Sequence, residues 1–381
     1  MSKRACAAAA LFGGVLLAFW LVVAISFPGG LSFEFCHYGE IGRNLASGAG
    51  LRTGVLFPGE AAILKSRGVD LSEPAPVLSR FPLNSLLTGA AILVFGDGDH
   101  AVLAVQGALL AGTAATAFWV FSAFLSPPGA LAAALLFSLS PSMLRGFALW
   151  GYPDLLFCLL LLVFHERWLR RADPWLLGAL AALCWLARPN FSLWLPVYAV
   201  HAVMAEGRSR ETALRLAKVL GSALLVVSPY VFYQARHYGA FLNPNLLWNL
   251  EQGVIIPEGG WNYYRLFGYS DFGAEHIAGL LAKGGRGFWG FLSSLPLLWQ
   301  MGWLLPLAGI GGWAWWRGDR DRRGWLALHL ALLAIQVAVF SFLRDETLGG
   351  RVAGRYYLWF GPTYCAAAVA GLEWIIQRRS L

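Results

Sequence analysis

Three ionisable side chains lie within seven positions of one another in the sequence EFCHYGE: Glu34, His37 and Glu40. A carboxylate that emerges at a membrane face beside aromatic residues is suited to general-base chemistry, because desolvation raises its basicity. If residues 34–46 form a helix, Glu34, His37 and Ile41 share one face of that helix. The structural alternative is that these polar residues only solvate a helix end at the interface.

Arginine residues in two distant segments are candidates for binding a phosphate. Arg80 lies in LSRFPLNSLL, and Arg351 and Arg355 lie in GGRVAGRYYLWFGP. A cation held at the level of the lipid headgroups can neutralise a lipid phosphate or diphosphate. Each arginine alone could instead be an anchor whose charged end reaches the interface. Their predicted placement on the same side of the membrane favours the phosphate interpretation.

Asp154 and Arg188 are charged residues at the ends of apolar stretches. Asp154 follows a proline in LWGYPDLLFCLL, and Arg188 precedes one in LARPNF. A carboxylate in the first turn of a helix is stabilised by the helix dipole, so a capping role for Asp154 is as well supported as a catalytic one. The turn around Arg188 needs the proline and asparagine but not an arginine.

The composition identifies the elements that must position these residues as membrane helices. Of the 381 residues, 58% are hydrophobic and only 13% are charged, where an ordinary soluble domain has about 25% charged residues. The mean hydropathy is +0.58. The basic residues behind the net charge of +8 are scattered among apolar spans, so we expect them to set topology and contact anionic lipid, and we expect no nucleic-acid partner.

About ten apolar runs are long enough, or nearly long enough, to cross a bilayer. They lie at residues 5–27, 100–125, 129–147, 151–165, 174–187, 190–205, 218–234, 297–316, 325–343 and 356–376. The sequence therefore predicts an all-α polytopic membrane protein, with residues 1–381 forming a single membrane-embedded domain.

Five basic clusters between these runs predict the topology. They are Lys3 and Arg4; Arg167, Arg170 and Arg171; Arg208, Arg210, Arg215 and Lys218; Arg317, Arg320, Arg322 and Arg323; and Arg378 and Arg379. Short basic loops stay in the cytoplasm, and an even number of runs separates each cluster from the next. Both termini are then cytoplasmic, and the apolar residues 83–96, too short to span, lie in the outer interface.

With this orientation, residues 28–99 and 235–296 form two large outer segments that contain interfacial helices. The location we expect is the bacterial cytoplasmic membrane. The chain lacks the P-loop, the dinucleotide-binding fingerprint, the GxSxG elbow and the HExxH motif. An enzyme whose site is outside the cytoplasm would meet no nucleotide-linked donors there, whereas a lipid-linked donor would be available.

Several ordered motifs resemble the GT-C superfamily of integral-membrane glycosyltransferases, in particular the protein mannosyltransferase and aminoarabinose-transferase-like branch. EFCHYGEIGRNLASG resembles its first outer loop, in which an acidic residue precedes a tyrosine by four positions, as Glu34 precedes Tyr38. RFPL before an apolar stretch, GYPD, LARPN and GRYYLWFGP resemble further motifs in the same order. In the family the acidic residue is usually aspartate, so Glu34 moves the carboxylate by about 1 Å.

The resemblance implies sugar transfer from a polyprenyl-phosphate donor to a hydroxyl of a glycan, lipid or protein acceptor, by a hexosyl or pentosyl transferase. Glu34 would be the general base of a single inverting displacement, Asp154 a second catalytic residue, and Arg80 would hold the leaving phosphate with Arg355. The expected substrate-binding residues are His37, Tyr38, Glu40, Arg80, Arg188, Arg351, Arg355 and Tyr356. This scheme requires no cofactor, although His37 beside two carboxylates leaves a divalent metal ion as an alternative.

Two other functions remain open from the sequence. A transporter or flippase of lipid-linked saccharides would share the apolar bulk and the basic outer surface, but such proteins commonly carry charges at the middle of the membrane, where these runs have almost none. A non-catalytic assembly subunit with the same fold would explain why glutamate replaces the usual aspartate.

Overall fold

The computed structural model describes residues 3–27, 29, 33–56, 58–77, 80–239, 250, 254–255, 273–343 and 353–379. Its α-helices are α1 (Lys3–Ser26), α2 (Phe33–Ala46), α3 (Pro58–Ser66), α4 (Pro82–Phe95), α5 (Asp99–Phe121), α6 (Pro127–Ser138), α7 (Asp154–Leu169), α8 (Pro174–Ala187), α9 (Leu195–Glu206), α10 (Arg210–Tyr238), α12 (Ile277–Ser294), α13 (Leu305–Trp316), α14 (Arg320–Leu343), α15 (Ala353–Tyr356) and α16 (Gly361–Arg379). Shorter 3-10 or π turns are η1 (Ser142–Ala148), η2 (Pro189–Trp194), η3 (Ala274–His276), η4 (Leu295–Gln300), η5 (Gly302–Leu304) and η6 (Leu358–Phe360), and the strands are β1 (Arg52–Thr53) and β2 (Ala75–Pro76). The expected all-α membrane architecture is confirmed.

The number of full-length spans among the described residues is smaller than the ten apolar runs suggested. Four helices, α1, α5, α10 and α14, are long and apolar enough to cross a membrane, and α6 with η1 makes a fifth if this pair, bent by 45°, counts as one span. Helices α7 and α8 have only 16 and 14 residues, and prolines divide two other runs, 190–205 and 297–316. Pro189, Pro196 and Pro306 each lie at the start of a helical segment, because proline fits the first turn of a helix but breaks its interior. Single apolar runs are thereby divided into short helices.

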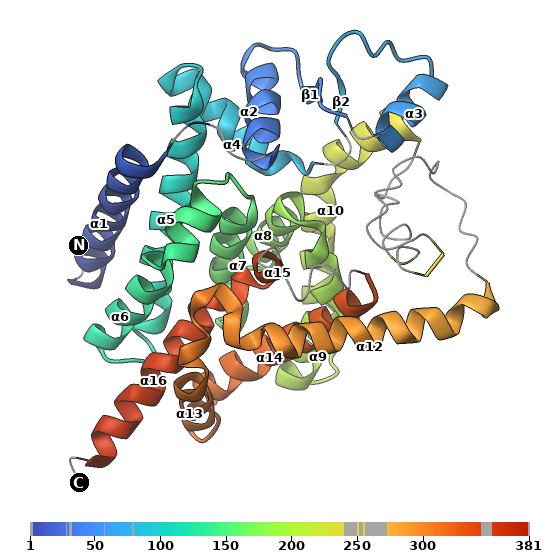
Figure 1. The fold of residues 1–381 in the computed structure, drawn as a ribbon. Coiled ribbons are helices and arrows are strands. Elements are labelled where there is room, and N and C mark those ends of the chain that lie inside the picture. Colours follow the sequence, from blue (N-terminus) through green and yellow to red (C-terminus); the bar gives the residue numbers. More distant parts are fainter. Residues whose placement is uncertain are drawn as a thin grey trace.

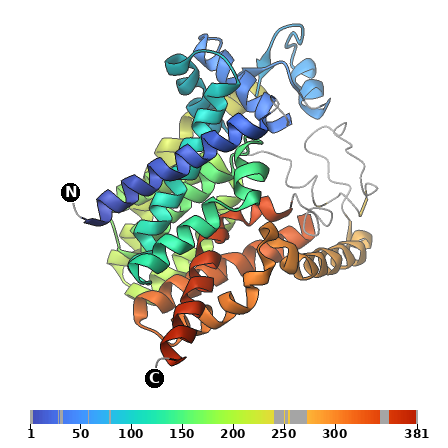
Figure 2. The same ribbon diagram turned by 60° about the vertical axis from the view of Figure 1, so that its left-hand side comes forward.

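The helices form a bundle in which α5 contacts α1, α4, α6 and α7, while α8 packs on α10 and α13 packs on α16 (Figure 1). Its apolar core is rich in fully buried aromatic side chains, among them Trp194, Trp325 and Trp359. Helices α1 and α16 both have their chain terminus at the end that points away from α2 (Figure 1 and Figure 2). Which compartment lies on each side of the bundle stays a prediction.

Helices α2 and α4 cross in close contact above the bundle (Figure 1). A Cβ added to Gly42 would lie 2.7 Å from the Thr88 side chain, and one added to Gly89 would lie 3.1 Å from the Gly42 carbonyl oxygen. Only glycine permits this approach of the two backbones. After α2, strand β1 pairs antiparallel with β2, with Arg52 opposite Pro76. These elements occupy the predicted outer segment 28–99.

Candidate active site

The Glu34 carboxylate lies between two arginine side chains from distant parts of the chain. Arg80 Nη2 is 3.3 Å from Glu34 Oε2, and Arg355 Nη1 is 3.4 Å from Glu34 Oε1. The three side chains are only 13–16% exposed, so water screens these contacts weakly. Glu34 is also in the first turn of α2, where the helix dipole favours a negative charge. The expected helix over residues 34–46 is confirmed, and its acidic residue faces both predicted phosphate-binding arginines.

Arg80 is held in place by the residues that start α4. The adjacent Phe81 is buried against Trp185, with ring centroids 5.2 Å apart, and against Tyr230. The Tyr230 hydroxyl donates a hydrogen bond to the Arg80 carbonyl oxygen at 3.3 Å. Pro82 then begins α4, which biases the preceding backbone towards an extended conformation. The RFP motif therefore fixes the backbone from which the Arg80 side chain extends.

His37 and Tyr38 contact Arg80, which in turn contacts the Glu34 carboxylate. Arg80 Nε donates to His37 Nδ1 at 3.3 Å, and the guanidinium carbon is 5.9 Å from the Tyr38 ring centroid. Burial and the nearby Arg80 charge lower the pKa of His37 to about 3. Burial, reinforced by Glu34, raises the pKa of Tyr38 to about 12. His37 is therefore a neutral acceptor that orients Arg80, and Tyr38 keeps its proton.

Arg355 is enclosed by aromatic rings. Its guanidinium carbon is 4.9 Å from the ring centroids of both Tyr152 and Tyr356, and its Nη2 donates to the Tyr356 hydroxyl at 2.9 Å. The Gln336 side chain donates to the Tyr356 carbonyl oxygen at 2.7 Å, which fixes this turn to α14. The Nε of Arg355 is buried and has no hydrogen-bond partner within the described residues. A donor of this kind suits an incoming anion.

Asp154 and Arg188 form a second ion pair beside this group. The Asp154 carboxylate accepts from Arg188 Nη2, and the Arg188 guanidinium carbon is 5.5 Å from the Tyr356 ring centroid. Asp154 is the first residue of α7, and Arg188 is extended because Pro189 follows it. Asp154 is thus paired with an arginine, and its catalytic role stays a prediction.

The turn that leads to Asp154 depends on a glycine. Gly151 has a φ of +69°, which other L residues rarely adopt, and a Cβ there would lie 3.0 Å from the Phe35 backbone of α2. This close approach brings the Tyr152 ring and the start of α7 against the helix that carries Glu34.

One expected substrate-binding residue, Glu40, does not contact this group. Glu40 instead accepts hydrogen bonds from the Thr53 hydroxyl at 2.6 Å and the Gly54 amide at 2.7 Å, so it ties β1 to α2. Arg351 lies outside the described residues. Among the residues that the structure describes, no group of three or more His, Cys, Asp or Glu side chains could hold a metal ion.

Sequence reasoning missed Tyr152 and Gln336. Tyr152 lies within the GYPD motif that drew attention to Asp154, and an aromatic ring predicted to lie near the membrane interface was a usable signal. Gln336 is a fully buried polar residue in an apolar helix, where a polar side chain is expensive and therefore marks a specific partner.

The comparison with solved structures finds the same architecture in a membrane protein with a bound lipid phosphate. The crystal structure of ArnT from Cupriavidus metallidurans bound to undecaprenyl phosphate matches 96% of this chain with a TM-score of 0.57 and 15% identity. The chain has the fold of this ArnT structure. It covers 59% of the ArnT chain, so the matched region is a little over half of that protein. No family model and no curated protein matches the sequence.

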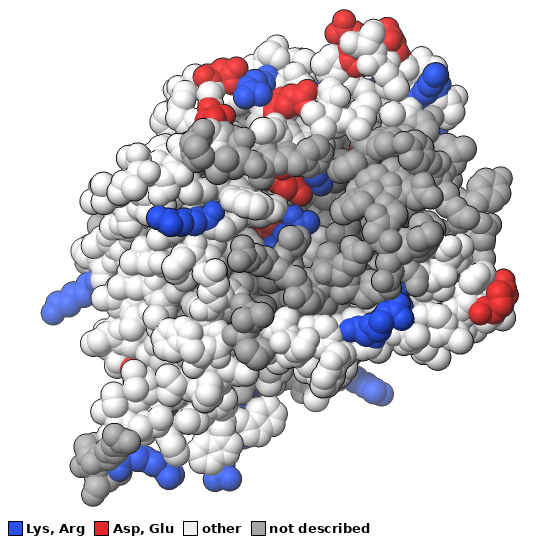
Figure 3. Space-filling view, viewed as in Figure 1, with Lys and Arg blue, Asp and Glu red and all other residues white. Residues whose placement is uncertain are grey.

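The charges of the site are recessed. Figure 3 shows a hollow near the middle of one face in which acidic and basic side chains are visible. With one carboxylate between two guanidinium groups and a second ion pair beside them, the site combines guanidinium groups that can contact an anion with a carboxylate that can accept a proton.

Proposed function

We propose that this membrane protein is a glycosyltransferase that moves a sugar from a polyprenyl-phosphate donor to an acceptor hydroxyl, with Glu34 as the general base. The observation that carries the proposal is the contact of Glu34 with both Arg80 and Arg355. It places a carboxylate for proton transfer beside two cations for a leaving phosphate. The lipid phosphate bound to ArnT, which has the same fold, supports this class of donor.

The reaction is a single displacement. The acceptor oxygen attacks the anomeric carbon while its proton passes to the Glu34 carboxylate, and the bond from that carbon to the phosphate oxygen breaks. The bond's electron pair leaves with the polyprenyl phosphate, whose charge the arginines stabilise. Attack opposite the leaving group inverts the configuration at the anomeric carbon. No step needs a metal ion or an organic cofactor.

Donor binding changes the contacts of the base. In the free protein the Glu34 carboxylate contacts both Arg80 and Arg355. A donor phosphate that takes over hydrogen bonds from these arginines releases the carboxylate from them. Glu34 can then contact the acceptor hydroxyl when the anomeric carbon is in place.

The neighbouring groups position this core. His37 and Tyr38 hold Arg80, while the Asp154–Arg188 pair, through the Tyr356 ring, holds Arg355. In this proposal the site faces the periplasm, and both termini are cytoplasmic.

The test is to incubate the purified protein with polyprenyl-phosphate sugars and candidate acceptors, and to detect released polyprenyl phosphate by mass spectrometry. The wild type should release it with acceptor present, and Glu34→Gln should not. Asp97→Asn is the matched control, because Asp97 is an acidic residue of the same segment that pairs with Arg43 on the surface. A transporter would leave every sugar attached to its lipid, and that result with a broad donor set would refute the proposal.

A further inference from the structure

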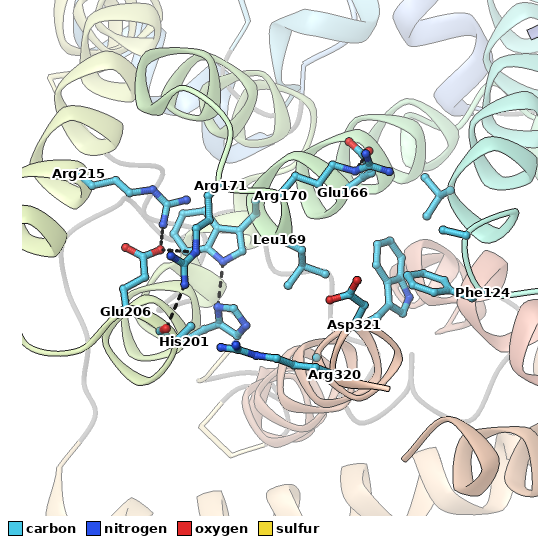
Figure 4. A pocket seen from close by; sticks show the side chains of 16 residues that line it. Phe124, Glu166, Leu169, Arg170, Arg171, His201, Glu206, Arg215, Arg320 and Asp321 are labelled. Atoms are coloured by element: carbon cyan, nitrogen blue, oxygen red, sulfur yellow. Dashed lines mark hydrogen bonds and ion pairs between the residues drawn. The ribbon is translucent and has the colours of Figure 1, made fainter. Parts of the chain in front are cut away.

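A second charged cavity lies at the end of the bundle opposite the Glu34 site. It has a volume of about 670 Å³ and is lined by residues of α5, α7, α9, α10 and α14 (Figure 4). Helix α7 connects the two places, since it begins at Asp154 in the candidate active site and ends at Leu169 in the wall of this cavity. Three of the predicted cytoplasmic basic clusters contribute Arg170, Arg171, Arg215 and Arg320 to the lining.

The arginines of this cavity outnumber the carboxylates that pair with them. Glu206 Oε1 is shared between Arg171, at 3.7 Å, and Arg215. Glu166 is likewise shared between Arg170, at 2.5 Å, and the neighbouring Arg167, at 3.3 Å. Arg167 is outside the cavity lining. The lining holds the four arginines Arg170, Arg171, Arg215 and Arg320 and the three carboxylates Glu166, Glu206 and Asp321, so the wall carries surplus positive charge.

Free hydrogen-bond donors accompany this surplus charge. Nη2 of Arg215 is buried and has no hydrogen-bond partner within the described part of the chain. The Trp168 indole donates to His201 Nδ1 at 3.2 Å, so a neutral His201 carries its proton on Nε2. Buried donors are almost always satisfied, and an unsatisfied one in a cavity wall indicates a missing acceptor.

One arginine adopts an unusual backbone conformation to reach the cavity. Arg171 follows α7 with a φ of +54°, at the helix end where glycine is usual. Its Nη2 donates to the Ala205 carbonyl oxygen at 3.1 Å, which holds the guanidinium across to α9. Nothing in the turn itself requires an arginine at this position.

Aromatic rings form the remaining wall. The Arg215 guanidinium carbon is 5.0 Å from the Trp168 ring centroid, and Trp325 and Phe124 also line the cavity. The site is therefore cationic on one side and apolar on the other. Its volume is within the range of about 300 to 1,000 Å³ that is usual for small-molecule sites.

We propose that this cavity binds a phosphate group through Arg171, Arg215 and Arg320. Guanidinium groups match the geometry of phosphate oxygens, and the surplus charge and free donors supply what such a group needs. The phosphate belongs either to a phospholipid headgroup of the adjacent leaflet or to a soluble phosphate ester. The proposal does not depend on sugar transfer, because it concerns the other end of the bundle.

Two probes applied to the full purified chain distinguish these sources. In the first arm, sodium phosphate is titrated against the thermal midpoint of unfolding, with sodium chloride at equal ionic strength as the reference. In the second arm, delipidated protein is incubated with phosphatidylglycerol or with diacylglycerol, and bound lipid is counted by native mass spectrometry. Stabilisation by phosphate identifies a soluble ligand, and selective retention of phosphatidylglycerol identifies a headgroup.

Variants with opposite expected effects test the assignment of the residues. Arg215→Gln should weaken binding of the active probe about tenfold, the equivalent of one charge-assisted contact. Arg320→Gln should weaken it without disturbing the fold, because Arg320 is exposed and has no ion pair among the described residues. Glu206→Gln should strengthen it, since two guanidinium groups lose their competing partner.

The matched control is Arg322→Gln, which removes an arginine of the same helix that pairs with Asp319 and does not line the cavity. Its binding should equal that of the wild type. The proposal is overturned if neither probe binds the wild type, or if Arg320→Gln and Arg322→Gln bind equally well. Weaker binding by folded Glu206→Gln would also overturn it, because purely structural ion pairs would then account for the charges.

Discussion

Replacing Glu34 with glutamine separates donor binding from transfer, because the carboxylate plays opposite parts in the two steps. In the free protein Glu34 competes with the donor phosphate for Arg80 and Arg355. Glutamine has nearly the same size but no charge, so it competes less. Glu34→Gln should therefore bind the donor more tightly than the wild type while losing the ability to accept the acceptor's proton.

The geometry sets the size of both effects. Glu34 makes its two arginine contacts at 3.3 and 3.4 Å, longer than the ~2.7 to 2.9 Å of the strongest charge-assisted pairs. Each contact then contributes about 1 kcal/mol rather than the upper value of about 3 kcal/mol. Removing both gives at most about a 30-fold gain in donor affinity. Loss of a general base lowers the transfer rate by roughly 10² to 10⁴-fold.

The assay measures both quantities on the same preparation. Donor affinity comes from competition against a labelled polyprenyl phosphate in neutral detergent, and transfer comes from mass spectrometry of released carrier lipid. Glu34→Asp completes the series, since a shorter carboxylate keeps the proton acceptor but moves it by about 1 Å. Wild-type transfer by folded Glu34→Gln, or weaker donor binding by this variant, would refute the reasoning.

Three further predictions follow from the same structure. Arg80→Gln should weaken donor binding by about 1.5 to 3 kcal/mol because a charge-assisted phosphate contact is lost, whereas Arg43→Gln, at an exposed ion pair, should bind like the wild type in the same competition assay. Cysteine at the exposed position Ser66, the last residue of α3, should react with an impermeant reagent added outside sealed cells, and cysteine at Ser209 should not. The reverse pattern would show that the topology is inverted. Burial lowers the pKa of His37 from 6.5 to about 3, so the unfolded chain binds a proton at this residue at a higher pH than the folded chain does. The free energy of unfolding should therefore fall by up to about 2 kcal/mol between pH 6.5 and pH 5. His37→Asn should flatten that part of the plot of thermal midpoint against pH, and an unchanged plot would mean that His37 is not buried as a neutral side chain.

Local features of the sequence predicted the elements of this fold well. The shared face of Glu34, His37 and Ile41 required that residues 34–46 be helical, and the structure has a helix at Phe33–Ala46. Composition alone predicted the membrane helices, because only intramolecular hydrogen bonding satisfies a backbone in lipid. The parity of the basic clusters predicted that Glu34, Arg80 and Arg355 lie on one side of the membrane, and the structure brings their side chains together.

Contacts between distant segments were not predictable in the same way. Glu34 and Arg355 are 321 positions apart, and their contact depends on how α2 and α15 pack rather than on either local pattern. The partner of Glu40 was out of reach for the same reason, since it lies on a strand of two residues that has almost no sequence signature. The sequence left Asp154 open as a cap or a catalyst and did not predict its pairing with Arg188, 34 positions away.

The close crossing of α2 and α4 at Gly42 and Gly89 sets the distance between these two helices. Glu34 is on α2, and Arg80 directly precedes the start of α4. A single methyl group at Gly42 would force the two helices apart against Thr88, and a shift of about 1 Å between reacting groups can slow catalysis about a hundredfold. Efforts to change the sugar or acceptor by redesign should therefore leave this helix crossing intact, since activity can be lost there without altering a single charge.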